Sequence, residues 1–163
     1  STRRLVLQGA DGVAFIADSQ LSETENNAAS LIDLKENLKE LGIALRDMPF
    51  VIQFNKRDLP SVRSDAEIEA LAQRGREPIF RATAIKGSGV LESFFGLLHL
   101  TWTKLESEHQ LAKMFCVERN GFLPMAARQF GYKGDTAALL AQNLGGSLDF
   151  EARASASGGK AKS

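Results

Sequence analysis

The sequence predicts an α/β domain in which a parallel sheet is covered by helices. Three short apolar runs, at residues 13–17, 51–54 and 79–80, have the length and composition of buried strands. Longer segments with apolar residues at helical spacing separate them and follow the last one. Because strands that alternate with helices are typical of parallel sheets, this order favours a sheet whose carboxyl-end loops carry the ligand site.

The first strand is predicted at Val13–Ala17, which is apolar on both faces. Ser22 and Glu25 have the spacing of a capping box, so a helix is expected to begin there. Its apolar positions recur at helical spacing, and Gly42 is a suitable residue to end it. These positions are Ala28, Leu31, Leu34, Leu38 and Leu41.

The second strand follows Pro49 and covers residues 51–54. Ser64 and Glu67 repeat the capping-box spacing, and the helix that they start is expected to stop near Gly75. The third strand is expected to begin at Ile79.

A strong amphipathic helix should follow the third strand. Its apolar stripe consists of Leu91, Phe94, Phe95, Leu98, Trp102 and Leu105. The stripe is compatible with a helix that continues to Cys116, and Trp102 is expected in the core. Short helices are possible at 125–130 and 136–144. A segment rich in Ala, Ser, Gly and Lys at 152–163 is expected to be disordered.

Composition limits the classes of function. The 163 residues contain 20 Lys and Arg and 20 Asp and Glu, which gives no sign of nucleic-acid binding. Cys116 is the single cysteine, so neither an internal disulfide nor a cysteine-rich zinc site is expected, and a reducing cytoplasm fits best. No apolar run reaches the length of a membrane span, and no prenylation motif suggests a membrane anchor.

The second strand leads into Asn55-Lys56-Arg57-Asp58, the NKxD pattern of guanine-nucleotide-binding proteins. Guanine presents two adjacent donors, and one ionised carboxylate, here Asp58, can accept both of them. The aliphatic stem of Lys56 can lie along the purine ring, while Asn55 can cross-link loops and contact the base edge. A polar turn after a strand is the alternative, but the position at the carboxyl end of a buried strand favours a ligand loop.

The third strand leads into a second candidate loop, Thr83-Ala84-Ile85, followed by Lys86-Gly87-Ser88-Gly89. It has the form of the second guanine loop, where a small residue lets backbone N–H groups approach the guanine oxygen. Alone it is an ordinary strand-to-helix loop. Together with NKxD, in the right order and each after a strand, it favours guanine binding.

These motifs belong to a longer resemblance. Residues 3–105, and most specifically Val51-Ile52-Gln53-Phe54-Asn55-Lys56-Arg57-Asp58-Leu59-Pro60, resemble the MglA-type bacterial Ras-like small GTPases. The resemblance implies a three-layer Ras-like P-loop G domain, present only in part. It also implies binding of GTP and GDP, slow GTP hydrolysis and a switch in cell polarity or gliding motility. A roadblock-type activating protein and effectors are the partners that it implies.

The sequence also departs from the family. It contains no G-x-x-x-x-G-K-[ST] phosphate loop and no recognisable switch segments, so no catalytic or metal-binding residue is assigned. Residues 1–8 resemble the segment of the family just after the second switch, so we expect a chain that starts in the middle of a G domain, lacks both switches, is inactive alone, and has Mg²⁺ only in the complete domain. Val13–Ala17 should then form an open sheet edge. The expected organisation is part of a G domain at 1–108, a helical extension at 109–150 and a disordered tail at 151–163. A non-catalytic pseudo-GTPase scaffold or protein-interaction module is the alternative.

Overall fold

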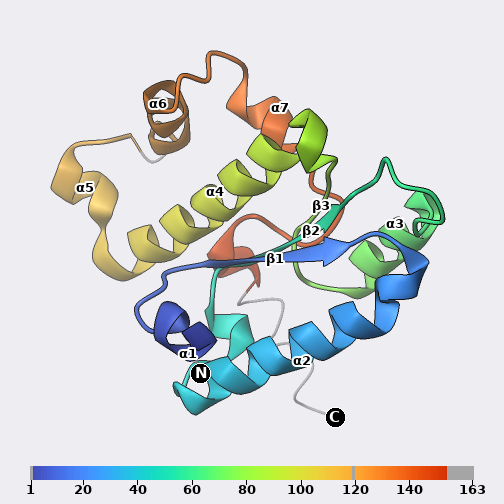
Figure 1. Ribbon diagram of the computed structural model, residues 1–163. Helices are drawn as coiled ribbons and strands as arrows, with labels where there is room; N and C mark the ends of the chain where they lie inside the picture. The colour runs from blue at the N-terminus through green and yellow to red at the C-terminus, as the bar shows by residue number, and fades with distance from the viewer. Residues whose placement is uncertain (1, 119, 154–163) are drawn as a thin grey trace, which may run out of the picture.

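The computed structural model describes residues 2–118 and 120–153. Strands and helices alternate through most of the chain, and the last part is helical (Figure 1). In chain order the elements are α1 (Thr2–Leu7), β1 (Val13–Asp18), η1 (Leu21–Glu23), α2 (Thr24–Glu40), η2 (Leu45–Asp47), β2 (Phe50–Asn55), α3 (Asp65–Arg74), β3 (Ile79–Arg81), η3 (Ala84–Lys86), α4 (Val90–His109), α5 (Leu111–Phe115), α6 (Phe122–Gln129) and α7 (Thr136–Leu140).

The three predicted strands form one parallel sheet in the order β1-β2-β3. Val13 pairs with Phe50 and Asp18 with Asn55, so β1 and β2 end together. Within the described residues β1 has β2 on one side and no strand on the other. The predicted α/β class, the parallel sheet and the open edge at β1 are therefore confirmed.

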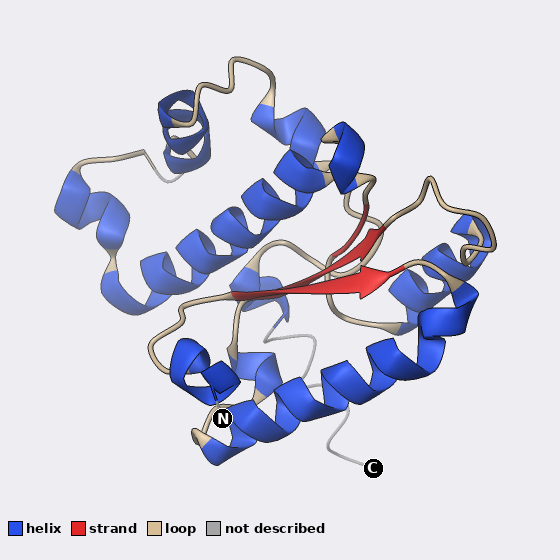
Figure 2. Ribbon diagram, in the orientation of Figure 1, coloured by secondary structure: helices blue, strands red, loops and turns tan. Residues whose placement is uncertain are grey.

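Helices cover both faces of the sheet, α4 on one and α2 with α3 on the other (Figure 2). Val51 and Phe80 pack with Leu100 of α4, whereas Ile52 and Phe54 point the other way and pack around Ile68 of α3. This alternation follows from the two-residue period of a strand. The apolar residues on the two faces of β2 therefore pack into two separate hydrophobic clusters, one on each side of the sheet.

The two predicted capping boxes have different outcomes. Ser64 caps α3: its hydroxyl accepts from the Glu67 amide, and the Glu67 carboxylate accepts from the Ser64 amide at 2.8 Å. The box predicted at Ser22 and Glu25 is wrong. The chain first makes the short turn η1, so α2 begins at Thr24, one residue later than a cap at Ser22 requires, and Glu23 is its N-cap without a side-chain bond.

Helix α2 ends as predicted near Gly42. This glycine has a φ of 76°, and its amide donates to Lys39 while the Ile43 amide donates to Leu38. The two bonds form a Schellman motif, which requires a residue that tolerates the left-handed conformation.

The last long helix is shorter than its apolar stripe suggested. Helix α4 ends at His109, because Gln110 has a left-handed φ of 52°, and α5 then starts in a new direction. Trp102 is buried, as predicted, and stacks on Phe122 of α6 with ring centroids 4.0 Å apart. The possible short helices near 125–130 and 136–144 correspond to α6 and α7.

The segment after α7 returns to the outer edge of β3. The Leu144 amide donates to the Ile79 carbonyl at 2.9 Å, and the Ile79 amide donates to Asn143 Oδ1 at 3.0 Å. Leu148 and Phe150 then pack against the cluster of β2, β3 and α4. Residues 143–150 therefore cover the β3 edge.

Ala152 and Arg153, expected in a disordered tail, lie instead in a helical turn over residues 150–153. Arg153 is almost fully buried, and its guanidinium lies 3.4 Å from the Glu77 carboxylate. The rest of the expected tail, residues 154–163, lies outside the described residues. In the described part of the chain, no helix combines the length and apolar character that a membrane crossing requires.

Candidate functional site

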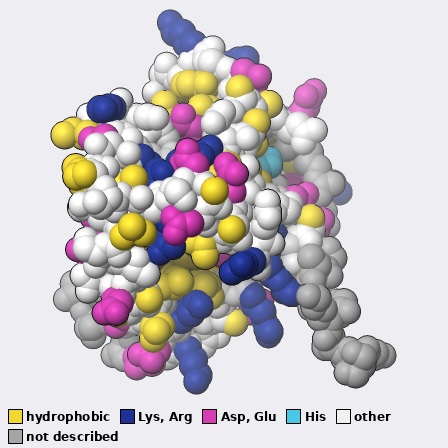
Figure 3. All heavy atoms as spheres, turned by 90° about the vertical axis from the view of Figure 1, so that its right-hand side faces the viewer, with side chains coloured by type: hydrophobic (Ala, Val, Ile, Leu, Met, Phe, Trp, Pro, Cys, Tyr) yellow, Lys and Arg dark blue, Asp and Glu magenta, His cyan; other side chains and the backbone are white. Residues whose placement is uncertain are grey.

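The two predicted loops lie side by side at the carboxyl ends of β2 and β3 (Figure 1). Asn55 is the last residue of β2, and Ala84 begins the short turn after β3. Figure 3 looks onto the end of the molecule where the strands terminate, and acidic and basic side chains lie next to one another across it. Parallel strands bring these loops together because all of their carboxyl ends meet at one edge.

Asn55 joins the two loops through a single oxygen atom. Its Oδ1 accepts from the Ala84 amide at 2.9 Å and from the Lys56 amide at 2.8 Å. The Arg57 amide adds a backbone bond to Ala82 at 3.2 Å. The cross-linking role expected of Asn55 is therefore present in the structure.

Lys56 follows in the left-handed conformation, with a φ of 63°. Its Nζ lies 2.6 Å from Oδ2 of Asp18, the last residue of β1, whose other oxygen accepts from the Gln20 amide at 2.9 Å. Partial burial raises the pKa of Asp18, but the hydrogen bond and charge of Lys56 outweigh this and hold the pKa below its usual value. The same bond raises the pKa of Lys56, so both groups are charged at neutral pH.

Asp58 is exposed, and its carboxylate makes no hydrogen bond or ion pair with the residues that the structure describes. Both of its oxygens therefore remain available for donors from outside the chain. A carboxylate with two free oxygens at the mouth of two joined loops suits a ligand that offers two adjacent N–H groups.

The second loop depends on glycine. The Thr83 amide donates to Ser88 at 2.9 Å and closes the loop, which turns at Gly87 with a φ of 76°. Gly89 has a φ of 77°, and a Cβ there would overlap the Arg81 carbonyl and Ala82. Ala84 and Ile85 are exposed beside Asn55, so the backbone around them is open to a ligand.

A polar hollow of about 260 Å³ lies beside Lys56. Asp18, Asn27 and Asn55 line it together with Lys56, and the N-terminal part of α2 forms its other wall. Asn27 fixes this wall to β1, because its side chain accepts from the Asp18 amide at 3.1 Å and donates to the Asp18 carbonyl at 2.8 Å. The hollow therefore has rigid polar walls next to the two loops.

In the sequence, Asp18 directly follows the first predicted strand and is expected to be a loop or cap residue near the ligand edge, whereas Arg57 and Asp65 are not singled out. Arg57 occupies the variable position of NKxD, so the motif gives no reason to single it out. Its guanidinium nevertheless reaches Asp65 at the start of α3, with Nη2 2.7 Å from Oδ1. The sequence offered only two signals for this contact, namely a basic residue, Arg57, in the loop and an acidic residue, Asp65, seven positions after Asp58.

A curated protein is similar to this chain in sequence. No family model matches the chain. The chain is 40% identical over 106 residues to the mutual gliding-motility protein MglA of Myxococcus xanthus strain DK1622. The match covers 65% of this chain and 54% of MglA, so the chain spans about half the length of this curated relative. The identity, the parallel three-stranded sheet and the two loops at its carboxyl end confirm the resemblance to part of an MglA-type Ras-like small GTPase.

Proposed function

We propose that this chain carries the guanine-recognition part of a GTP-hydrolysing molecular switch. The observation that supports this most directly is Asp58, an exposed carboxylate without a partner among the described residues, beside a loop that Asn55 ties to Ala84. The resemblance to a gliding-motility protein supports a role in motility or cell polarity. A cytoplasmic location fits the single free cysteine.

Each predicted residue has a defined task in this proposal. Asp58 accepts the ring N–H and the exocyclic amine of guanine, and so excludes adenine, which presents an acceptor there. The stem of Lys56 packs on the purine ring while Asp18 holds its ammonium group. In the second loop the Thr83 and Ala84 amides donate to Ser88 and Asn55 and hold the loop, and the backbone around the exposed Ile85 faces the guanine oxygen.

The residues present fit the base better than they fit the phosphates. The 163-residue sequence has no phosphate-loop motif, and the described residues contain no cluster of three acidic or histidine side chains suited to a metal. Because phosphate and Mg²⁺ contacts supply most of the binding energy and the catalysis in such proteins, we propose that this polypeptide alone binds GTP more weakly than about 1 μM and does not hydrolyse it. Mg²⁺, a roadblock-type activator and effectors belong to the complete switch.

The test is a change of base preference. Asp58→Asn replaces one acceptor oxygen with a donor, which opposes the guanine amine but suits the carbonyl of xanthine. Titration of ¹⁵N-labelled protein with GDP and with xanthosine diphosphate should show guanine preferred by the wild type and xanthine by the variant. We expect GDP binding to weaken by at least about tenfold, the effect of losing about 1.4 kcal/mol.

Glu36→Gln is the matched control, because it makes the same carboxylate-to-amide change at an exposed position in the second half of α2, outside both loops. It should keep the guanine preference. Equal affinity of the wild type for the two nucleotides, or an Asp58→Asn variant that binds GDP normally, would favour the scaffold or interaction module instead.

A further inference from the structure

The loop that carries Asp58 is closed at its base by the side chain next to it. Arg57 donates through Nη1 to the Arg63 carbonyl and through Nη2 to Asp65 Oδ1, the latter at 2.7 Å. One guanidinium thus spans the two ends of the 58–64 loop. Only 15% of the Arg57 side chain is exposed, so the guanidinium lies between the loop and the start of α3.

The far side of the same loop is attached to the residues that follow β1. The Leu21 amide donates to the Ser61 carbonyl at 2.9 Å, and the Arg63 amide donates to the Ser19 carbonyl at 2.7 Å. Ser61 has a left-handed φ of 54°, which turns the loop between these contacts. Backbone bonds therefore hold the later half of the loop, and the Leu59 amide, which donates to the Lys56 carbonyl at 3.2 Å, turns the half with Asp58. The Arg57 side chain joins this first half to Arg63 and Asp65 at the end of the loop.

We propose that Arg57 is a positioning residue that sets the direction of the Asp58 carboxylate and thereby the strength of guanine selection. The inference rests on the proposed function, because it concerns the same loop. A bidentate pair with guanine requires both oxygens of Asp58 to face the two donors, and a loop free to rotate at its base loses that alignment.

The contact is better suited to positioning the loop than to holding the fold together. Asp65 is 60% exposed, and ion pairs of this kind add little to stability. Asp65 also keeps a second partner, since Arg81 Nη1 lies 3.0 Å from its other oxygen. Loss of Arg57 therefore leaves Asp65 paired and α3 anchored, and its effect falls on the loop.

The geometry requires arginine. The two terminal nitrogens of the planar Arg57 guanidinium donate at the same time to a backbone carbonyl and to a carboxylate. Lysine has a shorter side chain with a single nitrogen atom at its end, so it cannot make both contacts in a fixed direction. Arg57→Lys should consequently behave more like Arg57→Gln than like the wild type.

The experiment measures GDP and inosine diphosphate binding by NMR titration of the full 163-residue chain. Inosine lacks the exocyclic amine, so the GDP:IDP affinity ratio reports the alignment of Asp58. In Arg57→Gln and Arg57→Lys this ratio should fall by about threefold to tenfold, because GDP loses the alignment of two hydrogen bonds and IDP that of one, and one charged hydrogen bond accounts for about a factor of ten. Arg81→Gln removes the other partner of Asp65 and should keep the ratio.

The outcomes separate the two proposals. A wild-type chain with no GDP:IDP preference overturns the proposed function, and the positioning role with it. A wild-type preference that Arg57→Gln retains overturns the positioning role alone. Equal weakening of GDP and IDP also overturns it, since that is the result of general loosening of the fold, and amide spectra of each variant identify any loss of structure.

Discussion

A single oxygen atom of Asn55 holds together the two loops that the sequence marks as ligand loops. Oδ1 accepts from the amides of Lys56 and Ala84, so rotation of this side chain would release both loops. The same residue ends β2, whose hydrogen bonds fix its backbone. The position of the loops is therefore set by the sheet and maintained by one amide group.

His99 gives the molecule a pH-dependent contribution to stability. Burial lowers its pKa below the ordinary value of 6.5, although the charge of Asp149 partly opposes this. Nδ1 is buried without a hydrogen-bond partner in the described chain, and the small hollow beside it also contains Glu106 and Glu151. Because His99 is neutral when folded and is protonated more readily when unfolded, stability is full above pH 6.5 and falls as the pH drops below it.

The measurement is the urea midpoint at intervals between pH 5 and 8, a range set by the ordinary histidine pKa of about 6.5. His99→Gln should flatten the decline of stability below pH 6.5. His109→Gln, at a histidine whose side chain is 59% exposed, should leave the decline unchanged. Asp18, Asp65 and Glu67 have lowered pKa values and ordinary values of 3.8, 3.8 and 4.5, so their contributions are lost only at more acidic pH. An identical decline in both variants would contradict the assignment to His99.

Residue types in a motif were predictable from the sequence, but contacts across a loop were not. Asn55 and Asp58 belong to a fixed pattern whose chemistry specifies them. Arg57 and Asp65 meet because the intervening loop turns back, and no local propensity encodes that turn. Asp18 pairs with Lys56 because β1 and β2 end in register, a consequence of tertiary structure.

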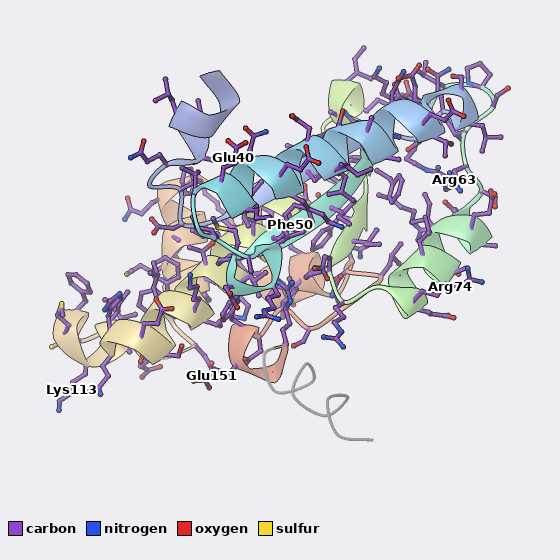
Figure 4. The ribbon with its side chains drawn as sticks, turned by 90° about the horizontal axis from the view of Figure 1, so that it is seen from below. Glu40, Phe50, Arg63, Arg74, Lys113 and Glu151 are labelled. Carbon is purple, nitrogen blue, oxygen red and sulfur yellow. The ribbon has the colours of Figure 1, made fainter. Side chains whose placement is uncertain are left out.

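At the scale of elements, the segment after α7 behaves as a substitute for a fourth strand at β3. It contributes a backbone bond from Leu144 and a side-chain bond from Asn143 to the same residue, Ile79. Close approach depends on Gly145 and Gly146, where a Cβ would overlap the carbonyls of Glu77 and Arg76. In Figure 4 the turn that carries Glu151, which directly follows this segment, lies in the lower half of the view, whereas α2 with Glu40 crosses the upper half.

Gly146→Ala should loosen this segment. The added methyl group overlaps backbone atoms of Arg76, which cannot move without disturbing β3, so we expect a loss of about 1–3 kcal/mol in the free energy of unfolding. Amide exchange of Leu144 and Gly146 should accelerate more than exchange within β2. Gln142→Ala, at an exposed neighbouring position, should change neither quantity. Unchanged exchange at Leu144 would show that the segment does not depend on this approach.

Capping-box spacing and apolar periodicity predicted the ends of some helices correctly and the ends of others wrongly. Ser64 and Glu67 cap α3 with both bonds of the capping box in place. The same spacing at Ser22 fails, since residues 21–23 form η1 between β1 and α2. Apolar periodicity extended past Gln110, but α4 ends there and α5 takes another direction.

At the scale of the whole molecule, the two edges of the sheet differ. The β3 edge is covered by residues 143–150, whereas β1 ends the sheet within the described residues. A hollow of about 470 Å³ runs beside β1 and is lined mainly by apolar side chains of β1, α1 and α2. Ile16 lies in its wall and is 51% exposed. An unpaired strand next to an apolar groove is the kind of edge that other chains can extend.

This asymmetry predicts concentration-dependent association through β1. Ile16→Lys places a charge on the edge strand, and since a second strand would have to bury that charge, association should weaken. Ile32→Lys is the matched control, because Ile32 is 57% exposed on α2 and does not line the hollow beside β1. Sedimentation velocity over a range of concentrations should show wild type and Ile32→Lys forming larger species together, while Ile16→Lys remains monomeric. If both substitutions act equally, general surface charge and not the β1 edge controls association.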